Sequence, residues 1–205
     1  NGSIKQPNMD ASNASLRESL EQRADKDRFK IWGKDGEVRD RFMVASNRPE
    51  NDENWKDGSE AWLGKASMSK HHRFMLINDL RWRFFNVLVF GMYDAYSLRE
   101  AIDTLEAMRD AALEFTKCDE TYSWSDNIGL YFHVYPHCSV NALHLHIVDK
   151  AHAGPTFKHL EFKNLSIDHV IDVLKEEEKE QPEWLREAWH AVKGSSRGGA
   201  GSREC

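Results

Sequence analysis

Two histidines separated by one residue are the side chains in this sequence best suited to chemistry. His144 and His146 alternate with Leu143, Leu145 and Ile147, a period-two pattern that predicts a β-strand. Residues two apart in a strand point to the same face, so both imidazoles share one face, while the aliphatic residues take the other and face the core. Such a pair can present a nucleophilic nitrogen beside a hydrogen-bond donor, or two nitrogens to a metal ion.

The bulk composition limits the classes of partner. The chain has 205 residues, of which 40% are hydrophobic and 30% charged, as expected for a globular protein with one sizeable core. Its net charge of -6 disfavours generic nucleic-acid binding. Its apolar runs are too short to span a bilayer, so we expect no membrane association. Its three cysteines have the spacing of neither a disulfide framework nor a zinc site, so we expect a reducing compartment and a cytoplasmic location. We expect neither a cofactor nor a resident metal.

The elements that must position the histidines lie between residues 74 and 148. Apolar runs predict strands at 74–77, 84–90, 128–135 and 143–148. Between the second and third of them, Ser97 and Glu100 have the spacing of a capping box, which predicts the start of a long helix. The helix carries an apolar stripe at helical spacing, formed by Leu98, Ala101, Ile102, Leu105, Met108, Ala112 and Phe115. This order predicts an α+β fold with a mainly antiparallel sheet crossed by one long helix.

The flanking segments are predicted to be peripheral. We expect an N-terminal extension over 1–70, partly ordered, with a short helix at 15–23, strands at 29–32 and 38–44, and a polar loop at 47–58. The central domain should cover 71–165. Helices should occupy 166–193, one of them capped by Ser166 and another starting near Pro182, before a disordered tail at 194–205.

The stretch around the two histidines resembles a known motif. The histidine triad family of nucleotide hydrolases and nucleotidyltransferases carries His-φ-His-φ-His-φ-φ, where φ is apolar, and residues 142–148 read Ala-Leu-His-Leu-His-Ile-Val. Within that family, residues 97–99 and 130–136 are most similar to the catalytic half of scavenger mRNA decapping enzymes. The resemblance implies the histidine triad fold, a small nucleotide substrate and, as in many small members, a homodimer.

The resemblance also implies roles for particular residues. His144 would attack the α-phosphorus and form a covalent nucleotidyl-histidine, and His146 would donate a hydrogen bond to the phosphate oxygens. Ser139 would contact the phosphate or the leaving group, and Asn78 and Asp79 would hold the ribose. Phe74 would line the base pocket, and His133 would supply a further imidazole. A neutral imidazole is a good nucleophile at neutral pH, which agrees with this chemistry.

One departure from the motif leaves alternatives open. The first triad histidine is replaced by Ala142, so His133 or His137 would have to supply a compensating nitrogen. A non-catalytic member that binds nucleotide or a protein partner is the alternative to an enzyme. A metal site is a third option, although it needs two more ligands. No cation is adjacent to His144 in sequence, and the candidates to meet phosphate charge are Arg73, Lys150 and Lys158.

Overall fold

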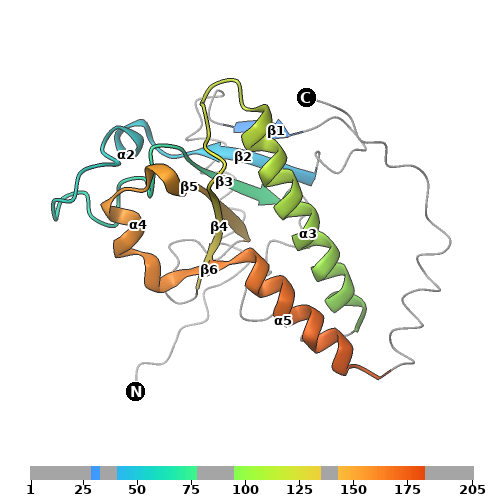
Figure 1. The fold of residues 1–205 in the computed structure, drawn as a ribbon. Coiled ribbons are helices and arrows are strands. Elements are labelled where there is room, and N and C mark those ends of the chain that lie inside the picture. Colours follow the sequence, from blue (N-terminus) through green and yellow to red (C-terminus); the bar gives the residue numbers. More distant parts are fainter. Residues whose placement is uncertain (1–28, 33–40, 78–94, 135–142, 183–205) are drawn as a thin grey trace, which may run out of the picture.

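The computed structural model describes residues 29–32, 41–77, 95–134 and 143–182. In this part of the chain, six strands form one antiparallel sheet in the order β1-β2-β3-β5-β4-β6. Helices α3 and α5 lie together along one face of the sheet, and the short helices α2 and α4 lie near the ends of the strands, on the left of the view (Figure 1). The predicted α+β class is therefore confirmed. The strands are β1 (Phe29–Trp32), β2 (Phe42–Ser46), β3 (His72–Ile77), β4 (Ile128–His133), β5 (His144–Asp149) and β6 (Asn164–Ser166), and the helices are α2 (Pro49–Glu53), α3 (Ala95–Cys118), α4 (Pro155–His159) and α5 (Ile167–Glu180).

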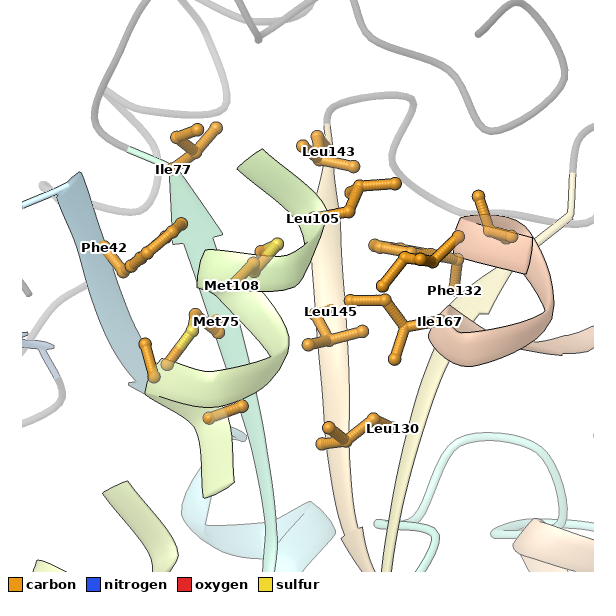
Figure 2. Close-up of a cluster of buried hydrophobic side chains, with 14 of the residues drawn as sticks. Phe42, Met75, Ile77, Leu105, Met108, Leu130, Phe132, Leu143, Leu145 and Ile167 are labelled. Atoms are coloured by element: carbon orange, nitrogen blue, oxygen red, sulfur yellow. The ribbon is translucent and has the colours of Figure 1, made fainter. Parts of the chain in front are cut away.

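The core lies between the sheet and the two long helices. Alternate residues of the central strands point toward α3, and Figure 2 shows Met75, Leu145 and Leu130 packed beneath it. The predicted apolar stripe of α3, from Leu98 to Phe115, is buried throughout. Each such aliphatic or aromatic side chain contributes about 1.5–3 kcal/mol when fully buried. Because α3 and α5 cover this face of the sheet, the opposite face is left for a functional site.

The start of α3 differs from the prediction. The helix begins at Ala95, two residues before Ser97, so Ser97 is not its N-cap. A serine followed three residues later by glutamate marks a helix start only where the preceding residues leave the helical conformation. Ala95 and Tyr96 continue the helix instead, so the predicted capping box is wrong.

Other boundaries also differ from the expectations. The predicted polar loop at 47–58 contains α2, because Pro49 at the first turn pre-sets the helical backbone angle. The second early strand, predicted over 38–44, is observed over Phe42–Ser46; residues 38–40 lie outside the described residues. The short strand β6 was not predicted; it pairs with β4 and leads directly into α5. Ser166 occupies the N-cap position of α5, as expected, but its side chain makes no capping hydrogen bond.

Several predicted elements lie outside the described residues. These are the helix at 15–23, the strand at 84–90, the helix from Pro182 and the tail. The proposed division at residue 70 stays a prediction, but β2, which precedes it, is the direct sheet neighbour of β3. In the described part of the chain, no helix has the length and hydropathy needed to cross a membrane.

Candidate active site

The sheet face opposite α3 and α5 carries the candidate site. Leu145 and Ile147 of β5 are buried in the core, so His144 and His146 point to the other face, as predicted. In the register of the sheet, Phe74 of β3 lies directly opposite His146. The rings of Phe74 and His146 meet edge to face with centroids 5.0 Å apart, and the His144 and His146 centroids are also 5.0 Å apart.

A cleft of about 360 Å³ opens over this face. It has the size of a small-molecule site. Within the cleft, His144 is half-buried, whereas only 4% of His146 is exposed. Its described lining contains four histidines, three cations and several apolar side chains, and no carboxylate. The lining includes Asn47, Arg48, Lys65, Met68, His72, Phe74, Leu76, His133, His144, His146, Leu160 and Lys163.

His72 is a site residue that the sequence analysis missed. Its Nε2 lies 3.0 Å from Nδ1 of His146, and the two rings stack with centroids 5.3 Å apart. Burial lowers the pKa of His72 to about 3, with further contributions from Arg73, His133 and His144. Burial also holds the pKa of His146 well below its ordinary value of 6.5. Both rings are therefore neutral at physiological pH, and each carries one proton.

The hydrogen bonds determine where each proton lies. The backbone N–H of Met68 donates to Nδ1 of His72 over 3.2 Å, so that nitrogen is an acceptor and the His72 proton is on Nε2. His72 Nε2–H then donates to Nδ1 of His146. The proton of His146 must therefore be on its own Nε2, which is buried and has no hydrogen-bond partner among the described residues. Because an unmet buried donor costs about 1–3 kcal/mol, this N–H is poised for an acceptor on a ligand.

His133 reaches the same place from β4. Its ring lies 3.8 Å from that of His146, centroid to centroid, and its Nε2 is likewise buried without a partner in the described part of the chain. Burial, followed by the charge of Lys163, lowers the pKa of His133 to about 3. A second neutral imidazole thus stands beside His146, at a position the sequence had marked as a candidate.

The cations at the site are not those the sequence suggested. Arg73 is paired with Asp52 at 3.2 Å and is absent from the described lining of the cleft, as are Lys150 and Lys158. The cations that line it come from distant segments instead; they are Arg48, Lys65 and Lys163. Sequence proximity to His144 was therefore the wrong guide, because the sheet brings loops from both ends of the domain to this face.

Four of the candidate residues stay predictions. Ser139, Asn78, Asp79 and His137 lie outside the described residues. Asp149 is fully buried away from the cleft, where it accepts hydrogen bonds from Ser125, Ala151 and His152. Among the described residues, no group of three or more histidine, cysteine or acidic side chains converges as it would around a metal ion.

The neutral, buried histidines make the fold sensitive to acid. Below pH 6.5 the histidines of the unfolded chain take up protons, whereas His72 and His133 stay neutral in the folded protein until about pH 3. Unfolding therefore takes up protons. The free energy of unfolding should fall by about 1.4 kcal/mol per pH unit for each such histidine below pH 6.5, and these groups contribute no pH dependence above it.

Urea denaturation between about pH 7.5 and pH 5 measures this slope. The His72→Phe variant should have a shallower slope, by about 1.4 kcal/mol per pH unit. The control His169→Gln, at an exposed position of α5, should match the wild type. A wild-type free energy of unfolding that is flat over this range would contradict the assignment of neutral buried rings.

Comparisons with known proteins bear on this geometry. Residues 93–179 match the family model described as "Scavenger mRNA decapping enzyme C-term binding". No curated protein matches the chain. Among solved structures, "Hnt3 in complex with DNA and guanosine" is similar with a TM-score of 0.45 and 19% identity, over 75% of this chain and 73% of that chain. The family match contains α3, β4 and β5 with both His144 and His146, so the predicted resemblance to the histidine triad superfamily is confirmed over this part of the chain.

Proposed function

We propose that the protein is a nucleotide hydrolase or nucleotidyltransferase that acts on a nucleoside phosphate ester, anhydride or amidate through a covalent intermediate on His144. One observation carries this proposal. A half-buried imidazole, His144, lies beside a neutral imidazole, His146, whose only proton is held on an unpartnered Nε2. The pair thus offers a nucleophile and a fixed donor in one cleft.

In the first step a ring nitrogen of His144 attacks the α-phosphorus and forms an N–P bond. The bond from phosphorus to the leaving group breaks, and the proton released from the other ring nitrogen balances the charge of the leaving group. Nε2–H of His146 donates to an equatorial phosphate oxygen as negative charge accumulates there. Water, or an acceptor alcohol in a transferase, then attacks phosphorus and breaks the N–P bond. The proton lost by the water or alcohol restores the neutral His144 ring, and the nucleotidyl product is released.

The walls of the cleft suit the two halves of a nucleotide. Phe74, Leu76 and Leu160 supply apolar surface for a base. Arg48, Lys65 and Lys163 supply positive charge for phosphate. The absence of a carboxylate from the described lining means that no acidic group there repels an anionic substrate.

A turnover assay with three substrate classes tests the proposal. A nucleoside 5′-phosphoramidate, a dinucleoside polyphosphate and a nucleotidyl ester are each incubated with the purified protein, and released nucleoside monophosphate is separated by chromatography. We expect catalytic release from at least one class. Saturable nucleotide binding with no release from any of them would contradict enzymatic function and support the alternative, a histidine triad scaffold that binds nucleotide or a protein partner. The replacement of the first triad histidine by Ala142 motivates that alternative.

A further inference from the structure

We propose that Asn47 is a positioning residue, which sets the tautomer of His72 and through it the donor on His146. The inference deepens the proposed function and rests on it for its catalytic consequence. It identifies a residue that lies far from His144 in sequence and is placed at the site by the pairing of β2 with β3.

The orientation of the Asn47 amide follows from its surroundings. Its Nδ2 lies 3.2 Å from Asp52 Oδ1, 3.4 Å from the carbonyl oxygen of His72 and 3.1 Å from Nδ1 of His72. A carboxylate and a carbonyl only accept hydrogen bonds, so the amide nitrogen, and not its oxygen, must occupy this position. Nδ2 has two hydrogens for these three acceptors, and its shortest contact is with Nδ1 of His72. We therefore assign one N–H of Asn47 to Nδ1 of His72, beside the Met68 backbone N–H that also donates there.

Asp52 holds the amide in this orientation. Its carboxylate accepts a hydrogen bond from Ser67 Oγ and pairs with Arg73 Nη1 at 3.2 Å. Arg73 is itself buried, with 8% of its side chain exposed, and Nη1 also donates to the His72 carbonyl oxygen. The carboxylate cannot turn away without leaving the buried guanidinium unpaired, which is strongly destabilising.

The tautomer of His72 determines which nitrogen of His146 carries the proton. Two donors at Nδ1 of His72 exclude a proton from that nitrogen, so the proton stays on Nε2 and is donated to His146. In the opposite tautomer, Nε2 of His72 would be an acceptor, the proton of His146 would move to Nδ1, and Nε2 of His146 would present a lone pair to the phosphate oxygen. The same ring in the wrong tautomer would then repel the substrate that it should stabilise.

The test is an Asn47→Asp variant, which keeps the shape of the side chain but cannot donate. Nitrogen-15 NMR of the histidine rings, without substrate, reports which nitrogen carries the proton. In the wild type we expect both His72 and His146 to be protonated on Nε2. In Asn47→Asp a carboxylate, which only accepts, replaces the donor and competes with the Met68 N–H for Nδ1 of His72. We therefore expect His72 to gain a proton on Nδ1, and kcat to fall about tenfold or more while KM changes less than about threefold.

Two variants control for general damage. Asn54→Asp makes the same chemical change next to α2, where the Asn54 amide bonds only the Glu50 carbonyl oxygen among the described residues, and should leave the tautomers and kcat as in the wild type. Asn47→Gln retains a donor amide and should preserve the wild-type tautomers of His72.

The NMR results test the role of Asn47 independently of the proposed function. A wild-type spectrum with the His72 proton on Nδ1 would overturn it whether or not any variant folds. Unchanged tautomers in Asn47→Asp, or a tautomer change with an unchanged kcat in an active enzyme, would also overturn it. If no substrate is turned over, the proposed function fails, while the NMR comparison still shows whether Asn47 sets the two tautomers.

Discussion

Replacing His144 with alanine should lower kcat by at least ~10³-fold, about 4 kcal/mol of transition-state stabilisation, for any nucleotide that the wild type turns over. The reason is that a covalent route needs a nucleophile, and neither nitrogen of His146 offers a free lone pair in its place, because its Nε2 carries the proton. Nδ1 of His146 accepts from His72, and both rings are buried. Single-turnover rates of monophosphate release measure the effect.

The matched control is His169→Ala, because His169 lies exposed on α5, across the sheet from the cleft. It should retain wild-type turnover. Binding of a nucleoside monophosphate to His144→Ala should change by no more than a few-fold, since the apolar and cationic walls remain. Full turnover by His144→Ala with every substrate would exclude His144 as the nucleophile.

Replacing His72 with phenylalanine should lower kcat by about 10²-fold, although the His72 N–H donates to His146 and not to the substrate. Phenylalanine keeps the stacked position but removes the hydrogen bond to Nδ1 of His146, which frees that ring to adopt either tautomer. Loss of a group that orients a reacting residue costs about 10–100-fold, and a wrong imidazole tautomer can cost more. Steady-state kcat and KM are the measurement, and KM should change little.

Two further variants separate tautomer control from stability. His71→Phe alters the adjacent buried histidine, whose ring contacts Tyr122 and Trp124 rather than the site, and should lower stability without a 10²-fold loss of kcat. His72→Gln retains an N–H donor and should recover part of the rate. Equal losses of kcat in His71→Phe and His72→Phe would contradict a specific role for His72.

The sequence was informative wherever the signal is local. Alternation around His144 predicts a half-buried strand, and the apolar stripe from Leu98 to Phe115 predicts a helix packed on the sheet; the structure confirms both. These patterns depend only on the period of the strand or helix. They also predict that the two imidazoles share the face away from the core.

The rest of the site depends on contacts between distant segments. His72 meets His146 because β3 and β5 are paired in one particular register, and no local pattern specifies that register. Arg48, Lys65 and Lys163 reach the cleft from a helix cap, a turn and a 3-10 turn. Their proximity follows from the packing of loops around the sheet, which composition and periodicity do not encode.

Two further histidines near His146 bear on the loss of the first triad histidine. Ala142 lies outside the described residues, but His72 and His133 place two additional imidazoles within reach of His146. A polar network around the histidine pair is therefore present without an imidazole at position 142. This supports the proposal of an active enzyme over that of a binding scaffold.

Trapping the covalent intermediate tests the nucleophilic role of His144 without recourse to kinetics. The protein is mixed with substrate, quenched in alkali because the N–P bond of a phosphohistidine is labile in acid, and examined by intact-protein mass spectrometry and peptide mapping. If His144 is the nucleophile, the mass increases by one nucleotidyl group, which is located on His144 and absent from His144→Ala. Turnover that proceeds with no adduct on His144, or with the adduct on another residue, would contradict it.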